Sequence, residues 1–471
     1  MLYCLCLLGF CLRVHGLTTQ SLWRDEVDSW RFALAAEPAW LLKPGWNGPA
    51  YHLALRGWIL AAGQSEYALR FPSALASAAC LPALWWVSKE LIGKRAALVG
   101  IILLSCSPYH IWYAQEAKMY ALLCLMSVAS FGFLWRALSA GGAVALGLYA
   151  LSAALLPYIH VFGVLLIPAQ LAAAACTWGH LPRRRLLSFA LLVVGPALLY
   201  VPLGRWQLGL FLSGFRTGHP DYTLGQMLGI LARGWPLGIV AAVEWWLAMP
   251  HALGLAAGVI EACRRESWRL RFVVAWLTVP LFLVFLVCTR TPLFADRYLI
   301  GSLPAFVLLT ASGLERLLAR RKWLGVGAAG LAVAAALYGV WMQGRFSIKA
   351  DMRSAAAITL QWWQDGDALL LQIPYLEHSA RYYLGAQWEP LPGPYTNGGM
   401  SEDQVGAYLA ERLAGSRRVW LWLSEASMWD ERGLTLKWLD EHCRPTRRWE
   451  LARVAVYLFE GCDGASPQLP K

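Results

Sequence analysis

EYALRFPSALASAACLPALWWVSKELIGKRAALV (66–99) holds the pattern that decides the fold of this chain. An apolar run centred near residue 81 ends in a short basic cluster, Lys89, Lys94 and Arg95, and a second apolar run centred near residue 102 follows at once. Each run has about the 15–20 residues that a helix needs to cross the hydrocarbon layer of a bilayer. The stretch therefore predicts two membrane-spanning helices joined by a basic turn.

The same alternation of apolar runs and basic clusters extends over most of the chain. Of the 471 residues, 58% are hydrophobic and 15% are charged, whereas about a quarter are charged in a typical soluble domain. Much of the net charge of +12 lies in short clusters between apolar runs, which is the positive-inside pattern. Composition therefore argues against nucleic-acid binding and predicts a membrane protein in contact with anionic lipid. The clusters are Lys89, Lys94 and Arg95; Arg183, Arg184 and Arg185; Arg264, Arg265, Arg269 and Arg271; and Arg316, Arg320, Arg321 and Lys322.

About eleven apolar runs have the length of a membrane span. A second apolar stretch at 236–249 competes with the run near residue 255. Placing every basic cluster in the cytoplasm puts the N-terminus inside, and the first loop (18–71) and the C-terminal tail outside. We predict an all-α polytopic domain over residues 1–344 in a bacterial-type inner or plasma membrane. The predicted spans are centred near residues 9, 81, 102, 128, 149, 169, 195, 255, 280, 308 and 332.

The first loop and the tail have their own patterns. Two stretches of the loop, 26–37 and 50–62, are amphipathic and predict helices that lie in the outer interface. Residues 345–471 contain no run of membrane length and predict a small extracytoplasmic α/β domain. Its predicted strands are DALLLQI (367–373) and RVWLWLS (418–424), and its predicted helices are 353–364 and 401–414.

RRWELARVAVYLFEGC (447–462) predicts a hairpin that turns near Ala452 and Arg453. Cys443 and Cys462 are symmetric about this turn. A cross-strand disulfide is sterically plausible in an oxidising compartment, and two free thiols are the alternative.

The most informative polar segment is SLWRDEVDSW (21–30), directly after the first span. Asp25 and Glu26 are adjacent carboxylates at the start of a predicted interfacial helix. The alternative is that acids at this position do no more than interact favourably with the dipole at the helix N-terminus. Trp23 and Trp30, however, place the pair at headgroup depth, where ionisable groups are costly unless they have a function. The segment therefore predicts a catalytic acid pair.

Two further outward turns concentrate polar side chains. SPYHIWYAQEAKMYALL (107–123) follows the third span, and TRTPLFADRYLIGSLPA (289–305) lies at the outer end of the tenth. A solvated loop is the plain alternative for the first, and a snorkelling interface anchor is the alternative for Arg297. If the first segment is one helix, one face carries His110, Tyr113, Glu116 (or Ala117) and Tyr120. The candidate site residues are His110, Gln115, Glu116, Lys118, Arg297 and Tyr298.

SLWRDE (21–26), HIWYAQEAKMYALL (110–123) and DRYLIGSLPA (296–305), in this order, resemble the GT-C glycosyltransferases of family 39. That family includes protein O-mannosyltransferases and the aminoarabinose transferase that modifies lipid A. Each motif alone is moderately specific, but the resemblance runs over most of the membrane part and also covers 66–99.

The resemblance implies the GT-C fold and a role for each matching residue. Asp25 would be the general base, and Glu26 would position the acceptor or the sugar. Gln115 and Glu116 would line the sugar pocket, and Arg297 would hold the donor phosphate.

The chain also departs from the family. Lys118 stands where the family usually has Arg, which keeps the charge but loses bidentate phosphate geometry. NGPAYHLAL (47–55) replaces a His/Asn-Pro-Pro-Leu-Tyr run, which leaves the role of His52 open. His110 and Tyr298 are further candidates for the donor site.

The chemistry accounts for these residue types. A polyprenyl-phosphate sugar has a leaving group that departs without protonation. The reaction therefore needs one carboxylate to take the acceptor's proton and cations to stabilise the departing phosphate. Asp25 would supply the first and Arg297, with Lys118, the second, across a cavity open to the exterior. We predict an integral-membrane, mannosyltransferase-like glycosyltransferase that works extracytoplasmically by a single inverting displacement.

The alternatives are an oligosaccharide ligase of the same superfamily, a transporter, and a receptor whose tail is the working part. A transporter would carry charges at mid-membrane depth and matched halves, and the sequence has neither pattern. No cofactor is predicted with certainty, and a divalent cation that bridges phosphate and Glu116 or Asp25 stays open. The sequence also leaves open the sugar, the acceptor (protein, lipid or glycan) and the oligomeric state.

Overall fold

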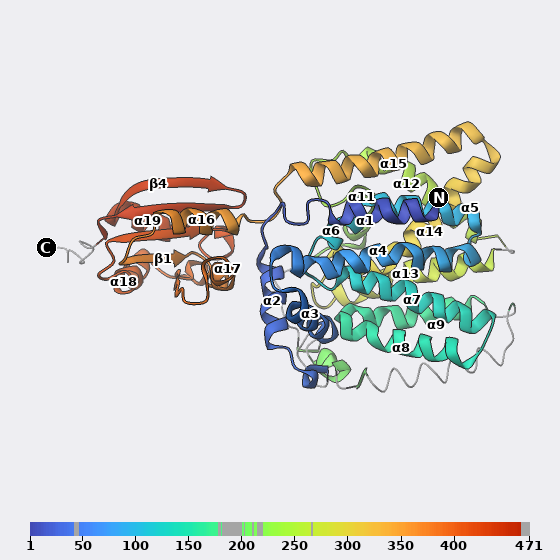
Figure 1. Ribbon diagram of the computed structural model, residues 1–471, viewed down its shortest axis with the longest axis horizontal. Coiled ribbons are helices and arrows are strands. Elements are labelled where there is room, and N and C mark those ends of the chain that lie inside the picture. The colour runs from blue at the N-terminus through green and yellow to red at the C-terminus, as the bar shows by residue number, and fades with distance from the viewer. Residues whose placement is uncertain are drawn as a thin grey trace. The chain divides into compact units, whose positions relative to one another are not determined.

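The structure is a computed structural model that describes residues 1–41, 47–177, 180, 200–201, 203–209, 212–213, 220–264 and 267–462. It divides into two compact units (Figure 1). The helical unit comprises residues 1–17 and 32–346, and the sheet unit comprises residues 18–31 and 347–471. Residues 18–31, which carry the acid pair, therefore group with the C-terminal part of the chain.

The helical unit confirms the predicted helical fold class. Every predicted span centre within the described residues falls inside a helix, while the centre near residue 195 lies outside them. Residue 255 lies within a helix, whereas the competing stretch at 236–249 is not one continuous helix. Within the described ranges, the α-helices of this unit are α1 (Leu2–Val14), α3 (Pro49–Ala62), α4 (Glu66–Leu91), α5 (Lys94–Cys106), α6 (Pro108–Ala114), α7 (Tyr120–Ser139), α8 (Ala143–Ile159), α9 (Leu166–Ala175), α11 (Leu224–Leu237), α12 (Met249–Ala262), α13 (Trp268–Cys288), α14 (Leu303–Arg320) and α15 (Lys322–Arg345). Helix α2 (Arg24–Ala35) begins in the sheet unit and ends in this one.

Among the described residues, 5 helices are long and apolar enough to cross a membrane by length and composition, or 6 if α5 and α6 form one bent span. The bend between α5 and α6 is 55°. Pro108 explains it, because a proline disfavours the helical conformation in the residue before it, and Ser107 accordingly has an extended backbone. The predicted number of spans stays a prediction.

Helix α14 lies at the centre of the helical unit, where it packs against α5, α12, α13 and α15. Every residue from Leu303 to Leu314 is buried. Glycines allow α12 and α14 to approach closely, because a Cβ atom at Gly313 would overlap the carbonyl oxygen of Gly254, and one at Gly258 would overlap that of Leu309. Such small-residue seams are typical of helices that pack within a membrane.

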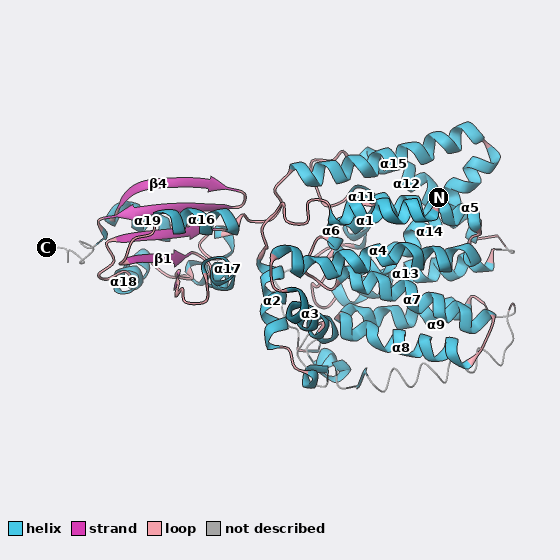
Figure 2. Ribbon diagram, viewed as in Figure 1, coloured by secondary structure: helices cyan, strands magenta, loops and turns pink. Residues whose placement is uncertain are grey.

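The sheet unit is a five-stranded sheet with strand order β2-β1-β3-β5-β4 (Figure 2). The pairs β1–β2 and β1–β3 are parallel, whereas β3–β5 and β4–β5 are antiparallel. Strands β1 and β3 confirm the predicted strands, and the turn at Ala452 and Arg453 confirms the hairpin. The strands are β1 (Asp367–Leu371), β2 (Leu391–Pro392), β3 (Arg418–Leu423), β4 (Arg444–Leu451) and β5 (Val454–Glu460).

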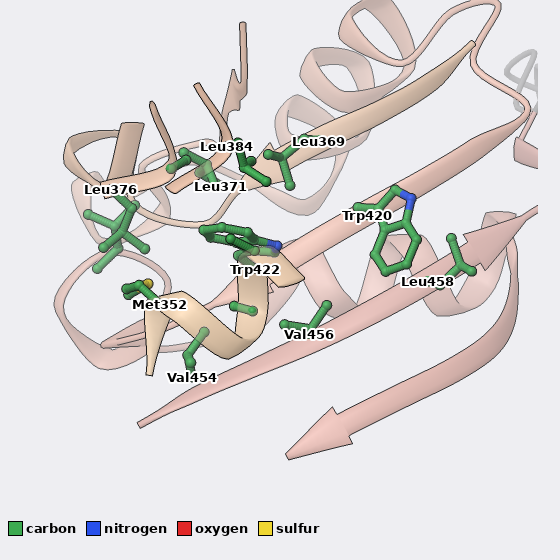
Figure 3. Close-up of a cluster of buried hydrophobic side chains, with 14 residues drawn as sticks. Met352, Leu369, Leu371, Leu376, Leu384, Trp420, Trp422, Val454, Val456 and Leu458 are labelled. Atoms are coloured by element: carbon green, nitrogen blue, oxygen red, sulfur yellow. The ribbon is translucent and has the colours of Figure 1, made fainter. Parts of the chain in front are cut away.

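Both faces of the sheet are covered, which explains why β1, β3 and β5 are mostly apolar runs, whereas the edge strand β4 is polar and largely exposed. One face packs against α16 (Met352–Trp362) and α17 (Glu377–Leu384), with Trp420 and Trp422 fully buried (Figure 3). The other face packs against α18 (Glu402–Arg412) and α19 (Leu434–His442).

Cys443 and Cys462, at the open end of the hairpin, form a disulfide with their Cα atoms 4.7 Å apart. The bond closes a loop with a sequence separation of 19 residues. We expect replacement of both cysteines by Ser to destabilise the sheet unit by about 3 kcal/mol, because the unfolded chain gains freedom. Hydrogen exchange of β4 and β5 in the full chain measures the effect.

Reductant should increase exchange in the wild type and leave the double variant unchanged. Cys263→Ser, which removes an exposed free thiol, is the control. A wild type that is insensitive to strong reductant would contradict the prediction.

Candidate active site

The acid pair lies in the first turn of α2, which begins at Arg24. Asp25 is half-buried, whereas Glu26 is 0% exposed. The Glu26 carboxylate accepts a hydrogen bond from Lys349 Nζ at 2.8 Å, and the Lys349 side chain is only 4% exposed. The two adjacent acids therefore differ sharply in environment, and only Asp25 combines a carboxylate with access to solvent.

Further polar side chains of the sheet unit lie near this helix turn. The Arg24 guanidinium lies 3.9 Å from the ring centroid of Tyr375. The Tyr375 hydroxyl donates a hydrogen bond to Glu425 at 2.6 Å. Burial, together with this bond to Glu425, raises the pKa of Tyr375. Tyr375 is therefore a hydroxyl donor, and Arg24 keeps a positive charge beside the acid pair.

The segment that follows α6 is not helical. Helix α6 ends at Ala114 and α7 begins at Tyr120. The condition under which His110 and Tyr120 would share one face of a single helix is therefore not met. The Gln115 side-chain amide donates hydrogen bonds to the carbonyl oxygens of Arg13 and His15 at 3.2 and 2.7 Å. These contacts tie the break to the C-terminal end of α1.

His110 lies in a different set of contacts from the other candidates. Its Nδ1 is 2.8 Å from Arg13 Nη2, and both side chains are fully buried. Because a guanidinium can only donate, Nδ1 is the acceptor, and the proton of the neutral ring is on Nε2. The imidazole therefore has no lone pair left for a metal ion.

This protonation state bears on a cofactor. The described residues contain one group of three side chains of the types that bind metal ions (His, Cys, Asp or Glu) with their ligand atoms within 4.8 Å of one another. This group is Cys80, His110 and Cys124. The Cys80–Cys124 sulfur separation of 3.9 Å would suit zinc, but Arg13 donates to Nδ1 of the imidazole and Nε2 carries the proton. The set as it stands does not fit a metal ion.

Lys118, Arg297 and Tyr298 gather around the start of α7 and the 3₁₀ turn Asp296–Ser302. The Arg297 guanidinium lies 6.0 Å from the Tyr120 ring centroid and 5.6 Å from that of Tyr298. Arg297 and Lys118 both act electrostatically on His160. We call Lys118, Arg297, Tyr298, Tyr120 and His160 the cationic cluster.

Acidic and phenolic groups adjoin this cluster. Asp296, Glu116 and Arg297 all act electrostatically on the buried Tyr113 hydroxyl. Glu116 is only 1% exposed. The structure thus brings Glu116, Lys118, Arg297 and Tyr298 together from two distant segments, while their roles in a donor site stay a prediction. Asp25 belongs to the other compact unit, and its meeting with Arg297 stays a prediction.

Two buried histidines belong to this region: His160 of the cationic cluster, which the sequence did not single out, and His52, whose role the sequence left open. His160 is 1% exposed, and its Nδ1 accepts from the Phe162 N–H at 3.1 Å, so the proton is on Nε2. His52 is 2% exposed, and neither ring nitrogen has a hydrogen-bond partner among the described residues. Burial, and then the charge of Lys118, lowers the pKa of His52 to about 3. Burial, followed by Arg297 and Lys118, lowers the pKa of His160 to about 3. Both rings are therefore neutral near pH 7.

The backbone of the 47–52 segment fixes both histidines. Gly48 has φ 77°, and a Cβ atom there would lie 2.6 Å from Met119 Cε and 2.9 Å from the Ile159 carbonyl oxygen. Asn47 Oδ1 accepts from the Val161 N–H at 3.0 Å. Glycine at this position allows the segment that leads to His52 to pass close to Met119 and to the Ile159 carbonyl oxygen, next to His160 in the chain.

A cavity of about 480 Å³ adjoins the cluster and shares Tyr298 with it. Tyr298 stacks on Phe162 with ring centroids 4.8 Å apart. The walls are mainly apolar, and the side chains there with polar atoms are Asn47, Tyr200, Trp206, Gln207, Thr291 and Tyr298. The apolar and aromatic wall residues include Val161, Phe162, Val164, Leu165, Leu208, Val287 and Leu293. The cavity therefore suits an apolar chain whose polar end lies at Tyr298.

Comparison with known proteins identifies the fold. Residues 46–206 match the family described as dolichyl-phosphate-mannose-protein mannosyltransferase. No curated protein matches the chain by sequence. The chain is similar to ArnT from Cupriavidus metallidurans in the apo state, with 14% identity, 97% of each chain covered and a TM-score of 0.64. The same protein bound to undecaprenyl phosphate gives 12% identity, coverage of 100% of this chain and 99% of that one, and a TM-score of 0.64.

The oligosaccharyltransferase of Archaeoglobus fulgidus, solved with Zn and sulfate, is also similar. Its identity is 13%, 96% of this chain and 73% of that chain are covered, and the TM-score is 0.61. These matches confirm the GT-C glycosyltransferase fold that the sequence motifs indicated. Together with the apolar helices, they identify a multi-pass membrane protein.

Proposed function

We propose that this chain is a glycosyltransferase that moves a sugar from a polyprenyl-phosphate carrier to an acceptor hydroxyl on the extracytoplasmic side of the membrane. The observation that carries the proposal is the pairing of two cations, Lys118 and Arg297, with an apolar cavity that begins at Tyr298. A lipid phosphate has two parts that match them: an anionic head for the cations and an apolar chain for the cavity. The undecaprenyl phosphate named for a solved structure of the same fold supports this choice of ligand.

The reaction is a single displacement. The acceptor oxygen attacks the anomeric carbon, the bond from that carbon to the phosphate oxygen breaks, and the configuration inverts. Asp25 takes the acceptor's proton, because it is the accessible carboxylate of the pair. The phosphate leaves as a dianion and needs no proton, so a second carboxylic acid is not required, in contrast to glycoside hydrolysis.

The charge that grows on the leaving phosphate is met by Arg297 and Lys118. Two cations balance one phosphate dianion, and Arg297 can bind it in a bidentate way. The neutral His160, a member of the same cluster, offers its Nε2–H as a hydrogen-bond donor for the phosphate. In this proposal His110 and Gln115 support the helices, while Glu116 borders the sugar.

An oligosaccharide ligase of the same superfamily is the alternative, since the archaeal oligosaccharyltransferase has nearly the same TM-score as ArnT. The charge balance favours a monophosphate donor, because a diphosphate leaving group would carry about one more negative charge than the two cations offset. Turnover in detergent with polyprenyl monophosphate sugars and with polyprenyl diphosphate sugars distinguishes the two functions.

Blocking the cavity tests the lipid part of the proposal. We expect Val287→Trp to raise the KM of a long-chain polyprenyl-phosphate sugar at least about tenfold, since each buried CH₂ group contributes about 0.8 kcal/mol. The KM of a short-chain analogue should change little. Val259→Trp, at a position 37% exposed on α12, is the control. An equal loss with both donors would show that the cavity does not hold the lipid.

A further inference from the structure

The buried ion pair between Glu26 and Lys349 joins residues that are 323 positions apart in the sequence. Both side chains are almost fully shielded from water, with the carboxylate at 0% and the ammonium side chain at 4% exposure. Removing two charges from water is unfavourable, and such a pair is tolerated only where geometry is fixed and further hydrogen bonds assist. The unfavourable burial of this pair, next to the proposed base Asp25, therefore indicates that the pair has a function.

The segment around Lys349 is itself held in place by the residues that lead into α2. The side-chain oxygen of Gln20 accepts hydrogen bonds from the backbone N–H groups of Ile348 and Lys349, each at 2.9 Å. Ser21 Oγ donates to the Ala350 carbonyl oxygen at 2.7 Å. These bonds hold the backbone of Lys349 in the position from which its side chain reaches Glu26.

The ion pair in turn fixes the rotation of α2. Successive residues of a helix point about 100° apart, because the helix has 3.6 residues per turn. Once Glu26 points to Lys349 and Val27 is buried beside it, Asp25 must point away from these two buried side chains. Asp25 is half-buried, in agreement with this direction.

We propose that Lys349 is a positioning residue: its ion pair with Glu26 sets the direction of the Asp25 carboxylate for proton transfer. The inference rests on the proposed function, in which Asp25 is the base. It also gives the C-terminal part of the chain a direct share in the chemistry, because Lys349 belongs to it. Glu26 then acts through this pair and does not touch the acceptor.

The test compares Lys349→Met, Glu26→Gln and the double variant of the full chain in detergent. Each single variant should lower the melting temperature by roughly 10 °C, because one charge is left buried alone. The double variant should regain most of this loss. Its kcat should nevertheless stay about 10- to 100-fold low with an unchanged donor KM, because the tie that orients Asp25 is absent.

Lys437→Met is the matched control, since Lys437 pairs with Glu402 at 2.7 Å on the surface of the same unit. It should change neither the melting temperature nor kcat. If kcat of the double variant recovers together with its melting temperature, the pair is only structural and the proposal is overturned.

The background of Asp25→Asn gives the decisive comparison. In that background Lys349→Met should add no further loss of kcat, because its effect passes through Asp25. A further loss of the same factor would overturn the positioning role while the base remains. Full activity of Asp25→Asn alone would instead remove the proposed base, so the two failures are distinguishable.

Discussion

Replacing Asp25 with Asn is expected to lower kcat by about 10²- to 10⁴-fold, the range found when a general base is removed. Asparagine has nearly the same shape as aspartate but cannot take the acceptor's proton. Since Asp25 is half-buried, the melting temperature should change little. The donor KM should also stay similar, because Asp25 acts on the acceptor and not on the phosphate.

Asp28→Asn is the matched control on the same helix. Asp28 is 25% exposed and pairs with Arg31 at 3.5 Å. Surface pairs of this kind contribute little, and we expect less than about a twofold change in kcat. Turnover of Asp25→Asn at the wild-type rate would show that another group accepts the proton.

The parts of the fold that could be predicted from sequence are those with a long, regular apolar pattern. The run around residue 81 became α4, and the short run at 418–424 became β3. In both cases burial alone decides the structure, so composition and length are sufficient. The acid pair and the polar segment 289–305 were singled out as candidate site residues, and their roles stay a prediction.

Other features depend on contacts between distant residues that leave no local pattern. Lys349 lies in an ordinary polar stretch, and only the folded chain shows that it meets Glu26. The segment that carries His52 passes close to Ile159, because Gly48 leaves room for this approach. The break after Ala114 has no proline or glycine to announce it, and Gln115 stabilises it through carbonyl oxygens of α1.

Replacing Arg297 with Ala is the second substitution with a large expected effect. The guanidinium faces the place where negative charge grows as the phosphate departs, and loss of one such contact lowers kcat by about 10²- to 10³-fold. Donor binding should weaken as well, since the ground-state phosphate already carries charge. Competition by undecaprenyl phosphate measures this binding separately from turnover.

Arg297→Lys separates charge from geometry. Lysine keeps the positive charge but cannot bind a phosphate through two parallel hydrogen bonds. We expect a loss of about tenfold in kcat/KM, between the wild type and the alanine variant. Arg290→Ala, at an exposed arginine seven positions earlier in the chain, is the control and should retain activity.

A combined replacement of Lys118 and Arg297 tests whether both cations bind the same phosphate. If both cations bind one phosphate dianion, the loss in the Lys118→Met and Arg297→Ala double variant should differ from the product of the single losses, because residues that share a ligand are coupled. Strictly multiplicative losses would mean that the two cations act on separate groups. The charge balance that favours a monophosphate donor would then no longer hold.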